Sequence, residues 1–377
     1  MTGNKDIKVT CIVGARPNFM KMAPILHAFD KHGGFITRLI HTGQHYDVEM
    51  NAVFFEQLGL KDPDLNLEIG SGSQTSMTAR IMLALEGAFQ QDPPDLVLVV
   101  GDVNSTLAAA LVAAKLRIPI AHVEAGLRSF DMDMPEEVNR LVTDRLSDLL
   151  LTTERSADLQ LQKEGVASEA IHFVGNVMID TLLSNLDKAI SMQETALKYD
   201  AEPSLVSGVK HGYALVTLHR PSNVDTPVQL AGLLDVVRDL AADMPVIFTL
   251  HPRTKARIAE GSLEMRLDHP GILKCPPLSY FEMLGAMRKA TLVITDSGGL
   301  QEETTALGVP CLTVRENTER PITIEQGTNT LVGGSPEKLR EAIKRLIAGK
   351  TKRGRVPELW DGHAAERIAK VIHDFAS

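Results

Sequence analysis

The sequence predicts an α/β protein built from two Rossmann-like, doubly wound domains that face a cleft. Apolar runs of strand length alternate with longer amphipathic segments along the 377 residues, a pattern typical of parallel sheets covered by helices. The run at 95–102 is almost continuous in Val and Leu, as expected of a strand buried on both faces. At roughly 150 residues per domain, the length predicts two to three domains.

The same alternation places the individual elements. In the first half, strands are expected at 7–14, 35–43, 95–102, 118–126 and 149–153. Helices are expected at 17–31 and 73–90, and also after the strands that end at 102 and 126. The second half repeats the plan, with a helix at 178–197, strands at 213–220, 245–252, 291–299 and 309–315, and a last helix at 363–375.

These elements divide the chain into three parts. Residues 1–177 form the expected N-terminal domain, which carries the acid–base residues, and residues 178–357 form the expected nucleotide-binding domain. The remaining segment, 358–377, contains a helix that could pack back on the N-terminal domain. A polar stretch at 199–212, rich in Gly, Pro and Ser, is typical of a linker or hinge loop.

Composition excludes several classes of protein. A net charge of −9 argues against a nucleic-acid partner or an anionic-membrane surface. Three cysteines without a CxxC pair argue against a disulfide scaffold or a cysteine zinc site and fit a reducing compartment. No HExxH or clustered metal signature occurs, so no metal is expected. Because the sequence has no stretch of about 18 apolar residues and no apolar leader, we expect a cytoplasmic protein without a membrane partner.

The first strand leads into a candidate anion site. Residues 14–24 read GARPNFMKMAP, in which Gly14 allows a tight turn and Pro17 suits the first turn of a helix. Arg16 stands near the N-terminus of that helix and Lys21 lies one turn further on. Backbone N–H groups, the helix dipole and two cations together favour an anion. The alternative is a plain strand–helix turn with solvated cations.

Three acids follow at or near the carboxyl ends of strands. Asp102 and Glu124 end two strands, and Glu136 falls in the first turn of the next helix. Carboxylates that converge on one cleft can have their acid and base pKa values pushed apart. The alternative is that Asp102 and Glu136 are helix caps and that Glu124 pairs with Arg128.

The second half supplies a further set of polar groups at strand ends. His219 and Arg220 end one strand, whereas the similar pair His251 and Arg253 is expected to be structural. Ser297, Gly298 and Gly299 open a helix and predict a second phosphate cradle. Glu303, one turn into that helix, could accept hydrogen bonds from ribose hydroxyls. A nearby loop adds Arg315, Glu319 and Arg320.

These features together suggest a nucleoside diphosphate ligand. No GxGxxG occurs, so the sequence gives no support for a nicotinamide cofactor, and we expect no cofactor at all. Two phosphate cradles with acids between them predict a nucleoside diphosphate whose attached group undergoes acid–base chemistry.

Eight ordered segments resemble the non-hydrolysing UDP-N-acetylglucosamine 2-epimerases. They are GARPNFMKMAP, TGQH, GDVNST, HVEAGLRS, MPEEVNR, TLHRP, TDSGGLQEE and TERP, and the resemblance runs from Val9 to about Gly334. It implies the glycosyltransferase-B fold, a homodimer, and interconversion of UDP-GlcNAc and UDP-ManNAc by inversion at sugar C2. Without a dinucleotide fingerprint, elimination of UDP to a glycal followed by re-addition is favoured over transient oxidation.

The resemblance also implies roles for individual residues. Asp102, Glu124 and Glu136 would transfer protons, while Lys21 and His219 would stabilise the leaving group. The substrate would be bound by Arg16, Arg220, Leu278, Met283, Ser297, Gly298, Gly299, Glu303 and Arg320. A second, regulatory UDP-GlcNAc site known in some members would involve Gln44, His45 and His251, although Asp47 stands where those members carry Gln.

More than one function remains compatible with these segments. The stretch HRPSNVD resembles relatives that act on different UDP-2-acetamido sugars, such as 2,3-diacetamido-glucuronates. A UDP-sugar glycosyltransferase on the same fold, a hydrolysing epimerase and a non-catalytic nucleotide-sugar sensor also stay open.

Overall fold

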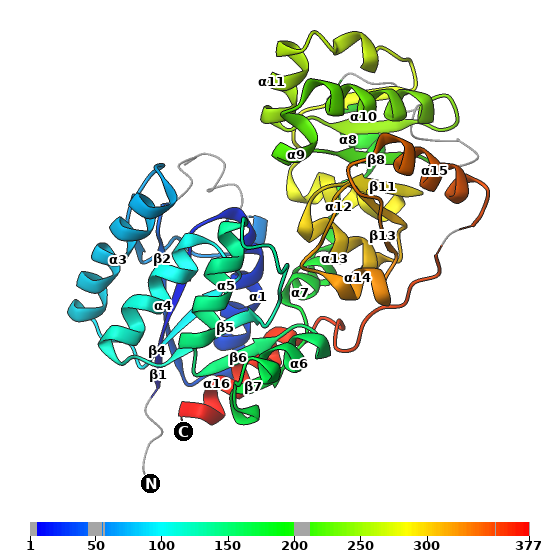
Figure 1. The fold of residues 1–377 in the computed structure, drawn as a ribbon. Coiled ribbons are helices and arrows are strands. Elements are labelled where there is room, and N and C mark those ends of the chain that lie inside the picture. Colours follow the sequence, from blue (N-terminus) through cyan, green and yellow to red (C-terminus); the bar gives the residue numbers. More distant parts are fainter. Residues whose placement is uncertain (1–5, 44–54, 56, 200–211, 351, 377) are drawn as a thin grey trace. The chain divides into compact units, whose positions relative to one another are not determined.

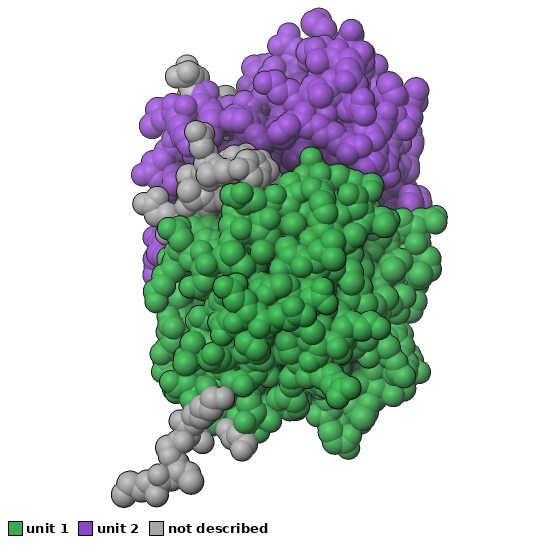
Figure 2. Space-filling view, turned by 90° about the vertical axis from the view of Figure 1, so that its left-hand side faces the viewer, with its two compact units in different colours: residues 1–181, 358–377 green, residues 182–357 purple. Residues whose placement is uncertain are grey.

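The chain forms two compact units, which Figure 2 shows in different colours. This computed structural model describes residues 6–43, 55, 57–199, 212–350 and 352–376. One unit comprises residues 1–181 and 358–377, and the other comprises residues 182–357. Most of the expected linker at 199–212, together with Gln44 and His45, lies outside the described residues.

The first unit is built on a seven-stranded parallel sheet (Figure 1). Its strand order is β3-β2-β1-β4-β5-β6-β7. The strands are β1 (Ile7–Val13), β2 (Phe35–His41), β3 (Leu65–Asn66), β4 (Leu96–Val100), β5 (Ile120–Ala125), β6 (Leu149–Thr152) and β7 (Ile171–Phe173). The helices are α1 (Arg16–His32), α3 (Gln74–Gln91), α4 (Asn104–Leu116), α5 (Pro135–Leu146), α6 (Arg155–Lys163), α7 (Val177–Ser184) and α16 (Ala364–Ala376). The boundary between the two units falls within α7, after Thr181.

The second unit repeats this plan on a six-stranded parallel sheet. Its order is β10-β9-β8-β11-β12-β13. The strands are β8 (Ala214–Thr217), β9 (Val246–Thr249), β10 (Ile272–Cys275), β11 (Leu292–Thr295), β12 (Cys311–Thr313) and β13 (Asn329–Leu331). The helices are α8 (Met192–Lys198), α9 (Pro221–Val224), α10 (Pro227–Leu240), α11 (Pro252–Glu260), α12 (Tyr280–Lys289), α13 (Gly298–Leu307), α14 (Pro321–Glu325) and α15 (Pro336–Ile347). Two Rossmann-like α/β units, as in the glycosyltransferase-B fold, confirm the predicted fold class.

Central strands are buried on both faces, as their composition predicts. All five residues of β4 are buried, because helices cover the sheet on both sides and leave no solvent-facing side chain. The three cysteines are free and buried. Within the described ranges, no helix combines the length and the apolar character needed to cross a bilayer.

The single helix expected at 178–197 is wrong. Helix α7 ends at Ser184, a short 3₁₀ turn covers Leu186–Lys188, and α8 begins at Met192. The hydroxyl of Ser191 accepts the Glu194 N–H at 3.2 Å, and the Glu194 carboxylate accepts the Ser191 N–H at 3.0 Å. This capping box starts a new helix where the apolar pattern alone suggested continuity.

The last helix packs within the first unit. The carboxylate of Asp180 accepts the backbone N–H groups of Ala364 and Ala365 at 3.1 and 2.7 Å. The indole N–H of Trp360 donates to the carbonyl of Thr153 at 3.1 Å. These contacts join the end of the chain to α7 and to the segment after β6, so residues 358–377 contribute to the first unit.

Candidate functional site

Both sheets contain a point at which the strand order reverses direction. In the first unit this point lies between β1 and β4, and in the second it lies between β8 and β11. Ligands of open α/β sheets bind beyond the carboxyl ends of the strands at such points. The residues that follow these four strands are therefore the ones to examine.

The turn from β1 into α1 is held tightly against β4. A Cβ on Gly14 would lie only 2.0 Å from the Ser105 hydroxyl oxygen, so no larger residue fits. The Asn18 amide oxygen accepts the N–H groups of Gly14 and Ala15 at 3.1 and 3.0 Å, and its amide nitrogen donates to the Val100 carbonyl at 3.0 Å. Arg16 is the first residue of α1. Asn18 therefore fixes the turn, but its side chain takes up the N–H groups of Gly14 and Ala15, so these two backbone groups are not available to an anion as the sequence prediction required.

Lys21 and Glu124 form a buried ion pair. Their side chains are 8% and 2% exposed. Glu124 has a φ of +70° at a shift in the β5–β6 register between Val123 and Ala125. A bulge of this kind re-aims a side chain at the end of a strand. Gly101 faces the pair, since a Cβ there would lie 3.1 Å from Lys21 Nζ and 3.2 Å from Glu124 Oε2.

This pairing overturns the alternative in which Glu124 pairs with Arg128. Arg128 instead contacts Asp144 at 2.7 Å and Glu164 at 2.6 Å. Lys21 therefore lies against a carboxylate in this structure, and its charge offsets the negative charge that Glu124 would otherwise bring to the site.

Asp102 lies beside the same turn and is partly exposed. Arg140 donates to its carboxylate, and the side chain of Asn139 donates to its backbone carbonyl at 2.8 Å. The N-cap residues of α4 and α5 are Val103 and Met134, so the alternative that Asp102 and Glu136 are caps is wrong.

Glu136 and its neighbour Glu137 have different surroundings. Glu137 is buried and accepts from the N–H groups of Ser129 and Phe130 at 3.0 and 2.9 Å, and from Arg140 at 2.6 Å. Burial alone would raise the pKa of Glu137, but these hydrogen bonds and the Arg140 charge lower it overall. Glu136 is half-buried and makes no hydrogen bond to the described residues. Glu137 therefore holds the loop, whereas the Glu136 side chain is only half-buried.

In the second unit, Asp296 organises the end of β8. This buried carboxylate accepts the N–H groups of His219 and Arg220 at 3.0 and 2.9 Å, the Asn223 amide at 3.0 Å, and the His219 ring at 2.8 Å. Burial would raise the pKa of Asp296, but His219 and the other donors lower it. The imidazole is 36% exposed, so the predicted His219 is fixed on one side and open on the other.

The N-terminus of α13 forms the second predicted cradle. Ser297 is the N-cap and Gly298 and Gly299 begin the helix. A Cβ on Gly298 would lie 2.9 Å from Glu319 Oε1. Glu319 pairs with Arg315 at 2.7 Å, and its pKa is lowered because Arg320 and Arg315 outweigh burial.

Further along α13, Glu303 is a buried carboxyl with no hydrogen bond among the described residues. Burial and the neighbouring Glu302 raise the pKa of Glu303 to about 8. Arg320 lies 2.9 Å from Glu302, so it neutralises that neighbour. The hydroxyl of Tyr280 is also buried without a partner in the described part of the chain, and its pKa is raised by burial and by Glu303.

The remaining predicted residues have plainer surroundings. Leu278 and Met283 are half-buried, before and within α12. His251 is the N-cap of α11, where its ring accepts the Arg253 N–H at 3.2 Å, as expected of a structural residue. Its ring centroid lies 5.4 Å from that of His219.

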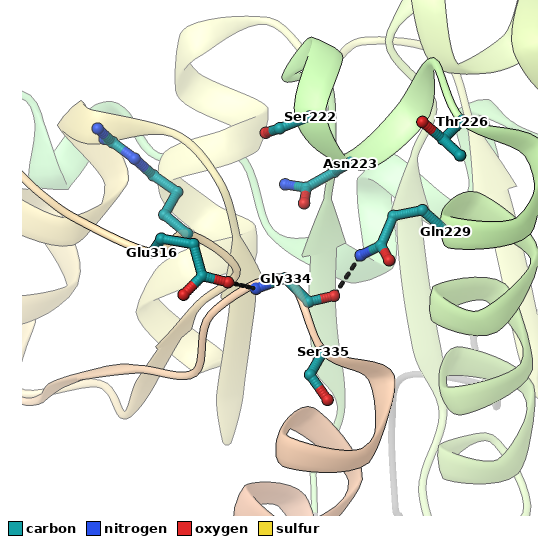
Figure 3. Close-up of a pocket in the computed structure, with 8 residues that line it drawn as sticks. Ser222, Asn223, Thr226, Gln229, Glu316, Gly334 and Ser335 are labelled. Atoms are coloured by element: carbon teal, nitrogen blue, oxygen red, sulfur yellow. Dashed lines mark hydrogen bonds between the residues drawn. The ribbon is translucent and has the colours of Figure 1, made fainter. Parts of the chain in front are cut away.

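A polar cavity adjoins the Asp296 cluster (Figure 3). It has a volume of about 470 Å³. Gly334 is one of the residues that line it; its N–H donates to Glu316 at 2.9 Å and its carbonyl accepts from Gln229. Ser222, Asn223, Thr226 and Ser335 complete the lining labelled in the figure. Across the described residues, no three His, Cys, Asp or Glu side chains gather as metal ligands would.

Three residues with organising roles escaped sequence reasoning. Asn18, Glu137 and Asp296 each satisfy several backbone N–H groups from inside the protein. Each lies within a segment that drew attention for a neighbouring residue. An acid or amide next to a candidate site residue is the signal that could have found them, because turns at strand ends need acceptors for their N–H groups.

Comparisons with known proteins identify the family of the chain. A family model described as UDP-N-acetylglucosamine 2-epimerase matches residues 27–373. A UDP-N-acetylglucosamine 2-epimerase from Methanococcus maripaludis is 40% identical over 368 residues, covering 97% of this chain and 98% of the relative. A UDP-2,3-diacetamido-2,3-dideoxy-D-glucuronate 2-epimerase from Pseudomonas aeruginosa is 38% identical, covering 97% and 99%.

A solved structure agrees as well. The crystal structure of Methanocaldococcus jannaschii UDP-GlcNAc 2-epimerase in complex with UDP-GlcNAc and UDP has a TM-score of 0.85 and 40% identity, covering 98% of this chain and all of that one. The family resemblance inferred from the eight segments is confirmed, and the chain belongs to the UDP-N-acetylglucosamine 2-epimerase family.

Proposed function

We propose that this protein is a non-hydrolysing epimerase that interconverts UDP-GlcNAc and UDP-ManNAc. The observation that carries the proposal is the buried Lys21–Glu124 pair, next to Asp102, at the β1/β4 reversal of the sheet. Family membership supports the substrate class, and a relative of known structure binds UDP-GlcNAc and UDP.

The chemistry must invert a carbon that bears an unactivated hydrogen. Sugar C2 has no adjacent carbonyl, so direct removal of its proton would give an unstabilised carbanion. In the proposed route, a carboxylate removes the C2 proton while the C1–oxygen bond breaks and UDP departs with the electron pair. The resulting glycal then receives a proton on the opposite face of C2, and a UDP oxygen re-forms the bond to C1. No electrons are gained or lost overall.

Each half of this reaction has candidate groups. Asp102, Glu124 and Glu136 transfer the protons, because each is a carboxyl group at the switch-point edge of the first sheet. Lys21 and His219 counter the charge that develops on the departing diphosphate.

The nucleotide is bound mainly by groups of the second unit. At the start of α13, Gly298 and Gly299 offer backbone N–H groups to the diphosphate, while the Ser297 N–H donates to the Thr295 hydroxyl at 3.0 Å. Glu303 accepts from the ribose, and Leu278 and Met283 contact the uracil. Arg16, Arg220 and Arg320 supply further positive charge near the phosphates.

A related UDP-2-acetamido sugar is the second candidate substrate. The Pseudomonas aeruginosa relative, named for a diacetamido-glucuronate, is almost as similar in identity as the UDP-N-acetylglucosamine epimerases. The chemistry at C2 is the same, so the two candidates differ only in the groups at C3 and C6 of the sugar.

One experiment separates these functions. The protein is incubated with UDP-GlcNAc in D₂O and the sugar is followed by NMR. Formation of UDP-ManNAc with deuterium at C2 supports the proposal. An unlabelled sugar pool points to a glycosyltransferase or a sensor, and free ManNAc as the main product points to a hydrolysing epimerase. The same assay is run with the UDP-2,3-diacetamido-glucuronate sugar. If the protein turns over that sugar but not UDP-GlcNAc, the second candidate is its substrate.

The proposal extends to a homodimer in the cytoplasm. Family resemblance supports the dimer, and three free, buried cysteines fit a reducing compartment. Light scattering of the purified protein tests the dimer, since a mass near 41 kDa would indicate a monomer.

A further inference from the structure

A buried histidine bridges two elements behind the candidate acids. His122, on β5, is fully buried. Its Nε2 lies 2.9 Å from the Gly101 carbonyl oxygen, and its Nδ1 lies 2.6 Å from an oxygen of Asp144 on α5. A carbonyl can only accept a hydrogen bond, so Nε2 carries a hydrogen. Nδ1 faces the Asp144 carboxylate, so the ring links the two elements.

The other oxygen of Asp144 completes the bridge. It accepts the Gly126 N–H at 3.0 Å and lies 2.7 Å from Arg128. Arg128 in turn donates to both oxygens of Glu164 at 2.9 and 2.6 Å. Burial would raise the pKa of Asp144, but the charges of His122 and Arg128 lower it overall. Arg128 therefore lies between two carboxylates, and His122 joins one of them to the Gly101 carbonyl.

This bridge forms hydrogen bonds to the backbone of both turns that carry candidate acids, at the Gly101 carbonyl and the Gly126 N–H. Gly101 directly precedes Asp102, and Gly126 follows Glu124 by two residues. The left-handed backbone at Glu124, with a φ of +70°, costs about 1–3 kcal/mol for a residue with a side chain. A backbone of this kind persists only when its surroundings hold it. If it relaxed by one residue of register, the Glu124 side chain would turn to the opposite face of the sheet.

We propose that His122 and Asp144 are positioning residues for the epimerase reaction. Together they fix the Gly101 turn and the Glu124 bulge, so that Asp102 and Glu124 keep the mutual geometry that proton transfer at C2 requires. The inference rests on the proposed function for its kinetic meaning. The competing explanation is that the cluster only adds stability to the core.

Two substitutions of Asp144 separate positioning from simple stability. In Asp144→Asn, the amide oxygen can accept the Gly126 N–H, while the amide nitrogen donates to the Nδ1 of a neutral His122. Nε2 still donates to Gly101, so all three hydrogen bonds survive without the charges. Asp144→Ala removes the bridge. Asp180→Ala is the matched control, because Asp180 is also a buried carboxylate of this unit that accepts two backbone N–H groups.

The experiment measures kcat per folded molecule, UDP affinity, and hydrogen exchange of peptides that cover 99–104 and 122–128. We expect Asp144→Ala to lower kcat about 100-fold, as a displacement of about 1 Å can, with unchanged UDP affinity and faster exchange in both peptides. Asp144→Asn should restore most of the turnover and the protection. Asp180→Ala should lower stability but leave kcat unchanged.

Equal kcat for Asp144→Ala and Asp180→Ala, or no recovery in Asp144→Asn, would overturn the inference. If Asp144→Ala does not fold, His122→Gln and His122→Leu are compared instead, because the Gln amide can still donate to the Gly101 carbonyl and Leu cannot. Equal kcat values in these two variants would also overturn the inference. If the wild-type protein does not epimerise UDP-GlcNAc, the proposed function is refuted instead. The difference in hydrogen exchange between Asp144→Ala and Asp144→Asn then tests by itself whether the bridge holds the two turns.

Discussion

Replacing Glu303 with Gln should stabilise the protein at alkaline pH. The carboxyl group is 5% exposed, and burial with the nearby Glu302 raises its pKa from 4.5 to about 8. Each unit of pKa shift corresponds to about 1.4 kcal/mol, so keeping this group ionised in the folded state costs up to about 5 kcal/mol. Gln keeps the shape of the side chain without the charge.

The sign of the effect follows from the direction of the shift. Between pH 4.5 and 8 the folded protein keeps a proton on Glu303 that the unfolded chain releases. The contribution of this group to the free energy of unfolding is therefore complete below pH 4.5 and declines by about 1.4 kcal/mol per pH unit until pH 8. The variant lacks this decline, so its advantage should be small at pH 5 and largest above pH 8.

Urea unfolding at pH 5, 7 and 8.5 measures the difference, and calorimetry measures UDP affinity at each pH. Glu264→Gln is the control, because Glu264 is an exposed acid of the same unit. Stability curves of wild type and Glu303→Gln that run parallel with pH would refute the assigned pKa. Glu303→Ala removes the acceptor oxygens altogether, so unchanged UDP affinity in that variant would refute the contact between Glu303 and the ribose.

Three further predictions concern the other site residues. Asp102→Asn or Glu136→Gln should abolish turnover yet leave UDP affinity largely intact; epimerisation by both variants would contradict the acid–base roles. Lys21→Ala or His219→Ala should depress kcat through lost stabilisation of the departing diphosphate, which a wild-type rate in both would disprove. Asp296→Ala should lower the free energy of unfolding by about 3–5 kcal/mol, the usual cost of breaking a buried pair. Because the pKa of Asp296 is lowered, that deficit should shrink as the pH falls below the ordinary Asp range, and urea titrations would detect a constant deficit instead if this reasoning is wrong.

The sequence predicted the interior of each sheet but not its edges. The strands that periodicity did not reveal are β3, β7, β10 and β13, which are the outermost strands of the two sheets. They contain only two to four residues each. A central strand is buried on both faces, so its sequence is a continuous apolar run. A short edge strand has fewer residues and need not be apolar throughout, so its sequence gives a weaker signal.

The candidate site was predictable to the extent that it follows strand ends. Asp102, Glu124, His219 and Ser297 all come directly at or after central strands of their sheets, so topology alone brings them to the ligand-binding edges. What the sequence could not reveal is the partner of each group. The Lys21–Glu124 pair depends on a bulge at which Glu124 adopts a left-handed backbone conformation. No local pattern of side chains predicts such a conformation.

Both units contain a His–Asp pair near the end of a strand, and the two pairs differ in how far the His ring is exposed. In each, a buried Asp accepts at least one backbone N–H just after a strand and also contacts a His ring: Asp144 with His122, and Asp296 with His219. His122 has both ring nitrogens occupied within the protein. His219 is 36% exposed, so its Asp orients the ring and leaves the outer nitrogen free to meet an anion. The buried pair has no access to a ligand, whereas the exposed pair fits the proposed contact of His219 with the diphosphate. The difference in burial between the two pairs cannot be predicted from the sequence.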